Sequence, residues 1–166
     1  MAKRQVFYSF HFTNDVMRVH QVRNIGIIEG NEPVSKNNWE ELKRKGKKSI
    51  QKWIDDNMKN RSCVVVLIGS ETANREWVKY EIKKAWNDGK GLVGIYIHNL
   101  KCPNNGKDTK GDNPFKNFTL DNGNKKLSSI VKTYNPSSLN AYNDIEENMD
   151  KLIEEAIEIR KNYTSQ

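Results

Sequence analysis

One carboxylate has an unexpected position in the segment SCVVVLIGSETANREWVKYEI, residues 62–82. Residues 63–68 form a continuous apolar run, typical of a strand buried on both faces, and residues 75–88 have the apolar spacing of an amphipathic helix. At about 100° per residue, Glu81 lies about 40° from Trp77 and within the apolar arc of that helix. The lysines of the helix fall outside the arc, so Glu81 is the charged residue expected to point inward.

Two interpretations of Glu81 fit this pattern. A buried carboxylate is costly unless it is paired or hydrogen-bonded, and its pKa tends to rise. Glu81 either lies at the margin of the apolar stripe, where it reaches solvent or pairs with a cation such as Arg75, or it is a functional carboxylate in a cleft. The helical pattern by itself leaves both open.

Other reactive side chains follow the predicted strands. Parallel sheets bind ligands beyond the carboxyl ends of their strands. Three such ends are Ser9-Phe10-His11, Gly69-Ser70 and His98-Asn99. The two histidines at these ends either line a crevice or make structural hydrogen bonds, and Ser70, which lacks a G-x-S-x-G context, is better suited to a helix cap or a loop bond.

Several familiar motifs are missing from the sequence. It contains neither G-x-x-x-x-G-K-[ST] nor G-x-G-x-x-G, the two common nucleotide-phosphate signatures. It also lacks H-E-x-x-H and any Cys/His cluster, which argues against a metal site. Cys63 falls in a strand pattern and Cys102 in a predicted loop, so we expect free thiols rather than a disulfide.

The composition indicates a soluble globular protein. The chain has 166 residues, of which 36% are hydrophobic and 30% charged, enough for one domain with its own core. No apolar run approaches the roughly 20 residues that span a bilayer, and the N-terminal apolar stretch is too short and interrupted for a signal peptide. We therefore expect a cytoplasmic protein that does not bind membranes.

The charge is divided unevenly along the chain. The net charge is +7, and much of the excess lies in KRKGKK, residues 43–48, whereas residues 143–159 are strongly acidic. The basic run is either a solvated helix face or an electrostatic aid to binding an anionic ligand or partner. Because it lacks interleaved aromatic residues and any recognised module, we do not expect nucleic-acid binding.

Strands and helices alternate around these candidate residues. Strands are predicted at 5–10, 63–68 and 91–100, a weak extended segment at 130–134, and helices at about 14–25, 39–58, 75–88 and 144–161. Residues 26–38 form a loop with room for a short strand, and residues 101–126, poor in core residues, form a long surface loop. Apolar strands separated by helices predict an α/β fold with a central, mainly parallel sheet covered on both faces.

Several segments resemble a known family. VFYSFH at 6–11 and VVLIGSETANREWVKYEI at 65–82 are similar to TIR-like domains, and especially to the ThsB proteins of the bacterial Thoeris anti-phage system. The likeness covers roughly residues 3–118 and includes RVHQVRN, WEELKR, GIYIHNLK and GDNPF. It implies a flavodoxin-like, TIR-like three-layer sandwich, with residues 1–166 forming a single TIR-like domain.

The resemblance also implies a chemistry for Glu81. TIR enzymes break the nicotinamide–ribose bond of NAD+ with a glutamate on the helix after the third strand, and Glu81 occupies that position. Trp77 matches the family's W-x-x-x-E pattern, although Val78 replaces the Cys usual after this Trp in many plant TIR domains. With Glu81 as the catalytic residue, the expected substrate-binding residues are Ser9, Phe10, His11, Ser70 and Trp77.

The family further implies a signalling role. Similar ThsB proteins convert NAD+, as substrate rather than cofactor, into a cyclic ADP-ribose isomer that activates a ThsA-like effector, typically SIR2-like. Some relatives make another ADP-ribose conjugate, so the linkage stays open, as does a homo-oligomeric state. The alternatives are an NAD hydrolase that releases linear ADP-ribose and a non-catalytic TIR-like module that acts through protein contacts.

Overall fold

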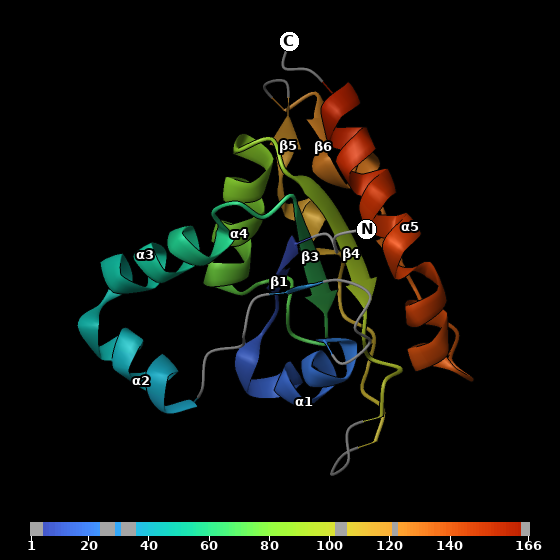
Figure 1. Ribbon diagram of the computed structural model, residues 1–166, viewed down its shortest axis with the longest axis horizontal. Coiled ribbons are helices and arrows are strands. Elements are labelled where there is room, and N and C mark those ends of the chain that lie inside the picture. The colour runs from blue at the N-terminus through green and yellow to red at the C-terminus, as the bar shows by residue number, and fades with distance from the viewer. Residues whose placement is uncertain (1–4, 24–28, 31–35, 102–105, 121–122, 164–166) are drawn as a thin grey trace.

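A parallel sheet forms the centre of the molecule (Figure 1). The computed structural model describes residues 5–23, 29–30, 36–101, 106–120 and 123–163. The sheet strands are β1 (Gln5–Ser9), β2 (Glu29–Gly30), β3 (Cys63–Ile68), β4 (Gly91–Tyr96) and β7 (Thr133–Tyr134). They pair in the order β2-β1-β3-β4-β7, and every pairing is parallel. This is the flavodoxin-like order, so the predicted fold class is confirmed.

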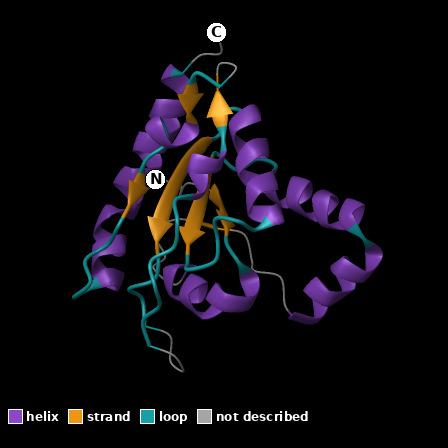
Figure 2. Cartoon of the chain, turned by 180° about the vertical axis from the view of Figure 1, so that it is seen from behind, coloured by secondary structure: helices purple, strands orange, loops and turns teal. Residues whose placement is uncertain are grey.

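Helices cover both faces of the sheet, which gives three layers (Figure 2). The helices are α1 (Phe12–Arg23), α2 (Lys36–Lys45), α3 (Lys47–Met58), α4 (Glu76–Asn87) and α5 (Ala141–Asn162). Helices α1 and α5 pack on one face, and α3 and α4 pack on the other. No helix in the described part of the chain is both long and apolar enough to cross a bilayer.

The predicted helix 39–58 is wrong, because the structure divides it into α2 and α3 at Gly46. The φ of Gly46 is 102°, a conformation that favours glycine, and its N–H bonds to the carbonyls of Leu42 and Lys43. The apolar spacing runs through both helices, so periodicity alone did not reveal the break. The two helices extend from one side of the sheet (Figure 1).

The prediction of residues 101–126 as a long surface loop poor in core residues is also wrong in part. The segment contains a 3₁₀ turn, η1 (Pro114–Asn117), and a short hairpin of β5 (Thr119–Leu120) and β6 (Lys125–Lys126). Phe115 is fully buried in the core beneath α3 and α4. A Cβ on Gly94 would lie 3.0 Å from the Phe115 ring, so glycine in β4 makes room for this side chain. Phe115 and Phe118 are isolated aromatic residues in a polar segment, so no helix or strand periodicity predicted this burial.

Other boundaries differ by a few residues. Helix α1 begins two residues earlier than predicted, at Phe12, and α5 begins three residues earlier, at Ala141. The predicted end of the first helix, near residue 25, lies outside the described residues. Strand β4 ends at Tyr96, before the predicted limit of 100. Cys63 is buried and forms no disulfide in the described part of the chain, whereas Cys102 lies outside the described residues.

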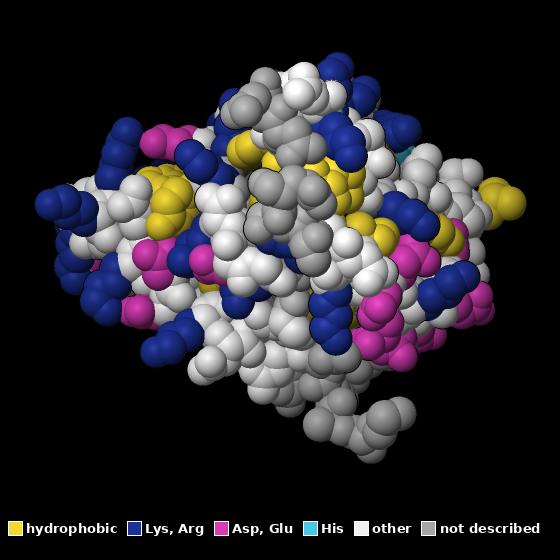
Figure 3. Space-filling view, turned by 90° about the horizontal axis from the view of Figure 1, so that it is seen from above, with side chains coloured by type: hydrophobic (Ala, Val, Ile, Leu, Met, Phe, Trp, Pro, Cys, Tyr) yellow, Lys and Arg dark blue, Asp and Glu magenta, His cyan; other side chains and the backbone are white. Residues whose placement is uncertain are grey.

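The surface charge is separated in space as well as in sequence. Viewed from above, Lys and Arg side chains gather over the α2–α3 side, and Asp and Glu side chains gather over the α5 side (Figure 3). Several α2–α3 lysines are exposed and form ion pairs within or between neighbouring helices, such as Lys45 with Glu41 at 3.4 Å. Many of these charges therefore belong to a solvated helix surface, one of the two interpretations left open.

Candidate active site

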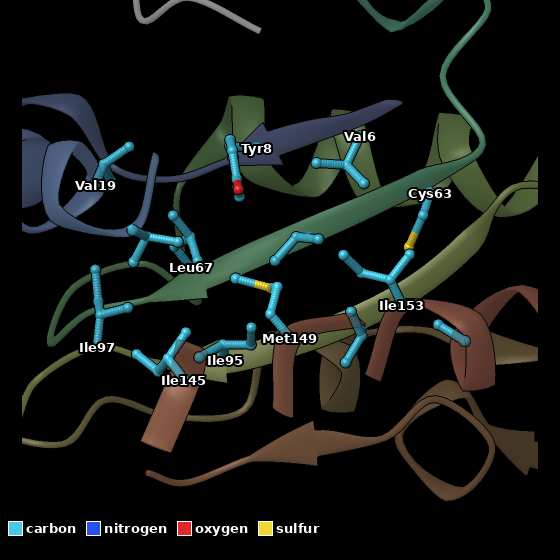
Figure 4. Close-up of a cluster of buried hydrophobic side chains, with 14 of the residues drawn as sticks. Val6, Tyr8, Val19, Cys63, Leu67, Ile95, Ile97, Ile145, Met149 and Ile153 are labelled. Carbon is cyan, nitrogen blue, oxygen red and sulfur yellow. The ribbon is translucent and has the colours of Figure 1, made fainter. Parts of the chain in front are cut away.

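The pleat of β1 decides which of its side chains face α4. Val6 and Tyr8 join the core beneath α1 and α5 (Figure 4), whereas Phe7 joins the core beneath α3 and α4. Because side chains alternate along a strand, Ser9 follows Phe7 toward α4. Phe10 instead packs against the core beneath α1 and α5. The two neighbours in the predicted site therefore lie against different layers.

Glu81 meets Ser9 across the interior of the protein. The Ser9 hydroxyl donates a hydrogen bond of 2.7 Å to Glu81 Oε1. Ser9 is fully buried and Glu81 is only 7% exposed, on the same stripe of α4 as Val78 and Ile82. The alternative in which Glu81 reaches solvent or pairs with Arg75 is wrong, since Arg75 pairs with Glu71 at 3.5 Å. Glu81 is the inward carboxylate that the helical pattern predicted.

The environment of Glu81 changes its acidity. Burial raises the pKa of Glu81 to about 8, and the hydrogen bond from Ser9 opposes that rise. The carboxyl group is therefore largely protonated at neutral pH. A cation bound beside it would favour the ionised form, because opposite charges lower a carboxyl pKa. The site thus favours a positively charged ligand or transition state once Glu81 is ionised.

This pair lies where ligands bind in sheets of this topology. Strand β1 has β2 on one side and β3 on the other, so the chain changes direction between β1 and β3. Ser9 is the last residue of β1 and pairs with Val66 of β3. Flavodoxin-like sheets hold their ligands at the carboxyl ends of these two strands. The Ser9–Glu81 contact is therefore at the expected position for a ligand.

Trp77 and His11 lie nearby in the chain, at partly exposed positions. Trp77 is one helical turn before Glu81, and its ring meets Tyr80 edge-on at 5.7 Å between centroids. Burial lowers the pKa of His11, as does the charge of Arg75, while the charge of Glu71 opposes the shift. Among the described residues, neither side chain makes a recorded hydrogen bond or ring contact with Glu81, and their roles stay predictions.

Ser70 makes a loop bond, one of the two structural roles considered for it. Its hydroxyl donates to Asp108 Oδ2 at 2.9 Å. The same Asp108 oxygen lies 3.8 Å from Arg18 Nη1, and Arg18 also donates to the carbonyl of Leu100 at 2.9 Å. Ser70 thus joins the turn after β3 to the segment that follows β4. A direct contact with substrate stays a prediction.

The sequence did not predict a second buried carboxylate, Asp15, which joins helix α1 to the turn after β3. Asp15 is fully buried, lies 3.8 Å from Arg18 and accepts a 3.5 Å hydrogen bond from Thr72. Thr72 in turn accepts from the N–H of Gly69 at 2.8 Å. A Cβ on Gly69 would lie 2.1 Å from an Asp15 oxygen, so only glycine fits there. The available signal of this buried pair was the arginine three residues after Asp15, one turn later on the same helix.

His98, the last of the predicted strand-end residues, lies two residues after the end of β4. It is 9% exposed, and its ring meets that of Tyr96 edge-on at 6.2 Å. Its Nδ1 atom is buried and has no hydrogen-bond partner among the described residues. No group of three or more His, Cys, Asp or Glu side chains in the described part of the chain is arranged to hold a metal ion.

Comparison with known proteins places this geometry in a family. A family model described as Thoeris protein ThsB, TIR-like domain, matches residues 7–102, more than half of the chain. A protein of Bacillus cereus (strain MSX-D12) named "Putative cyclic ADP-D-ribose synthase ThsB1" is 38% identical over 120 residues. The match covers 69% of this chain and 62% of that relative. Both findings confirm the resemblance drawn from the sequence.

Proposed function

The chain belongs to the ThsB TIR-like family, and on this premise we propose that it consumes NAD+, cleaving the nicotinamide–ribose bond to make a cyclic ADP-ribose isomer. One observation carries the proposal: Glu81, in the family's W-x-x-x-E pattern, lies buried against Ser9 at the β1–β3 ligand position. The cyclic product is supported by the name of the Bacillus cereus relative.

A single carboxylate suits this reaction. Cleavage at C1 of the ribose passes through an oxocarbenium-like state, which a nearby carboxylate stabilises. Nicotinamide is cationic in NAD+ and leaves as a neutral molecule when it takes the electrons of the C1–N bond, so it needs no general acid. Ionised Glu81 would stabilise the positive charge at C1 and bind the ribose hydroxyls. Ser9 would hold the carboxylate in place from the end of β1.

The acceptor decides the product. In the cyclic reaction, a nucleophilic atom at the adenosine end forms the new bond to C1 and loses its proton; in hydrolysis, water does so. Each route releases nicotinamide and one proton per NAD+. Cyclisation therefore requires the adenosine end to fold back toward Glu81 and to exclude water. His11, Ser70 and Trp77 are the residues proposed to shape that space, whereas Phe10 packs against the other layer and is no longer proposed for it.

The proposed partner is an effector that the product activates. The diffusible nucleotide would carry the signal to a ThsA-like protein, so no direct contact between the two chains is required. The chain spans 62% of the length of its Bacillus cereus relative. The effector is therefore a proposed partner.

The test is incubation of purified protein with NAD+, with and without a phage-derived trigger. Chromatography and mass spectrometry would resolve nicotinamide, linear ADP-ribose and cyclic isomers. We expect the wild type to form a cyclic isomer. Glu81→Gln should lower the turnover number at least about 100-fold, the usual effect of removing one group that stabilises charge in the transition state. Glu76→Gln is the matched control, because Glu76 is exposed on the same helix and pairs with Lys47 at 3.2 Å.

Other products would point elsewhere. Linear ADP-ribose alone would favour the hydrolase. Absence of nicotinamide release, with the trigger present, would favour a TIR-like module that works through protein contacts. Equal turnover in Glu81→Gln and wild type would remove Glu81 from the mechanism.

A further inference from the structure

A second polar cluster lies at the carboxyl end of β4, away from Ser9 and Glu81. Its centre is His98, whose Nδ1 is buried without a hydrogen-bond partner among the described residues. A buried polar atom without a partner costs free energy, unless a ligand or water supplies the missing bond. Lys110 and His98 both contact the Tyr96 ring: the Lys110 Nζ lies 4.7 Å from its centroid, and the His98 ring meets it edge-on at 6.2 Å.

The charges around His98 are mainly positive. Lys110, Lys107 and Arg18 act on the imidazole as cations, and Asp108 acts on it as an anion. Burial, followed by the charge of Lys110, lowers the pKa of His98 below its ordinary value. Beyond His98 itself, Arg18 is also opposed by the buried carboxylate of Asp15 at 3.8 Å, and Asp112 acts as an anion on the neighbouring Tyr96. Attraction for an anionic ligand therefore depends on which of the three cations has no partner of its own.

The backbone fixes the position of Lys110. The N–H of Asp108 bonds to the carbonyl of His98 at 2.8 Å, which returns the chain to the end of β4. A Cβ on Gly111 would lie 2.0 Å from the carbonyl oxygen of Gly69, so this glycine lets the segment lie directly on the turn after β3. Lys110, next to Gly111, is therefore anchored over the carboxyl edge of the sheet.

The three cations that act on His98 are Arg18, Lys107 and Lys110. Of these, Arg18 and Lys107 donate hydrogen bonds to other described residues, whereas Lys110 does not. Arg18 donates to the carbonyls of Leu100 and Gly106, each at 2.9 Å. Lys107 donates to the carbonyl of Ser138. Lys110 forms no recorded ion pair or hydrogen bond in the described part of the chain, and its side chain is exposed. It is thus the cation best able to bind an incoming anion.

We propose that His98 and Lys110 form a diphosphate-binding site at the carboxyl end of β4, which receives the diphosphate of NAD+. The identity of the ligand rests on the proposed function, whereas the anion site rests on the cluster itself. Strand β4 is two strands from β1, about 10 Å across the sheet, a distance that a dinucleotide can span. The diphosphate at β4 would leave the nicotinamide ribose free to reach Glu81.

Inorganic pyrophosphate tests the anion site without any turnover. The full chain would be titrated with pyrophosphate at 150 mM salt, on the order of physiological ionic strength, while NMR follows the ring resonances of His98 across a pH series. A bound anion favours the imidazolium, so we expect the pKa of His98 to rise by about one unit. Lys110→Ala should weaken pyrophosphate binding at least fivefold. Lys116→Ala, which removes an exposed lysine of the same segment, should bind as tightly as wild type.

Two results would overturn the site. One is a His98 pKa that does not respond to saturating pyrophosphate. The other is equal weakening in Lys110→Ala and Lys116→Ala, which would indicate general attraction to a protein of net charge +7. The wild-type titration decides the question even if Lys110→Ala does not fold. ADP-ribose should compete with pyrophosphate for the site. If it does not compete, the site does not receive the diphosphate of NAD+.

The experiment also separates this proposal from the proposed function. Glu81→Gln should bind pyrophosphate like the wild type, because Glu81 belongs to the other cluster. If the protein binds pyrophosphate through His98 and Lys110 but releases no nicotinamide, the anion site is supported and the proposed enzymatic function is wrong.

Discussion

At the scale of single residues, the contact between Ser9 and Glu81 is the informative one. The two residues are 72 positions apart in the chain, yet their side chains form a buried hydrogen bond of 2.7 Å. Within the described part of the chain, Glu81 forms no recorded ion pair, so burial and one hydroxyl govern its acidity. Its protonation state should therefore control the reaction proposed for it.

We predict that kcat/KM for NAD+ rises with pH, with a midpoint near the pKa of Glu81 at about 8. The ionised carboxylate is the active form, and kcat/KM reports ionisations of the free enzyme, so the value should increase about tenfold per pH unit well below the midpoint. Initial rates of nicotinamide release from pH 6 to 9 would measure this. A flat profile over that range would contradict the assignment.

Ser9→Ala sharpens the same prediction. The Ser9 hydroxyl favours the ionised form of Glu81, so its removal should move the midpoint above that of the wild type. Ser62→Ala is the matched control, because Ser62 has a hydroxyl that bonds to the carbonyl of Gln5, away from Glu81. A Ser9→Ala profile that coincides with the wild type would show that the hydroxyl does not tune Glu81.

At the scale of elements, Gly46 separates two helices that share one apolar pattern. Its φ of 102° is accessible to glycine and strained for other residues, although a Cβ there would meet nothing within 4 Å. The cost of a side chain at Gly46 is therefore conformational rather than steric. The division lets α2 leave the line of α3 while Leu42 still packs against the core beneath α3 and α4.

We predict that Gly46→Ala lowers the free energy of unfolding by about 1–3 kcal/mol, the cost of a non-glycine residue in such a backbone region. Urea denaturation monitored by circular dichroism would measure it. Lys45→Ala is the control, because it removes only an exposed ion pair with Glu41, worth less than about 1 kcal/mol. A stabilised Gly46→Ala would mean that α2 and α3 join into one helix, as periodicity alone predicts.

At the scale of the whole molecule, segments distant in sequence complete the core. Phe115 reaches the core beneath α3 and α4 from a segment rich in polar residues. A second such contact joins α5 to α4: Arg160 donates to the carbonyl of Trp86 at 3.1 Å and lies over its ring at 4.4 Å. This contact connects two helices that cover opposite faces of the sheet.

We predict that Phe115→Ala lowers the free energy of unfolding by about 3–5 kcal/mol, the usual cost of truncating a buried phenylalanine. Phe118→Ala, at a partly buried position in the same segment, should cost clearly less. Chemical denaturation of both variants would compare them. Equal, small losses would show that the segment does not pack against the sheet in solution.

The sequence by itself determined the features that depend on local backbone geometry. The apolar runs of β3 and β4 predicted buried parallel strands, and the helical period placed Glu81 on the inner side of α4, because strand and helix periods are properties of neighbouring residues. The motifs around Trp77 and Glu81 were sufficient to indicate the family, which the comparison confirmed.

Only the tertiary structure decided which distant groups meet. It brought Ser9 to Glu81 and placed Phe10 against the other layer, because the register and twist of packed layers depend on the whole chain. It also buried Asp15 beside Gly69 and left His98 Nδ1 without a partner among the described residues. Hydrogen bonds between segments depend on distances that no local pattern records, and for that reason the candidate site became specific only in three dimensions.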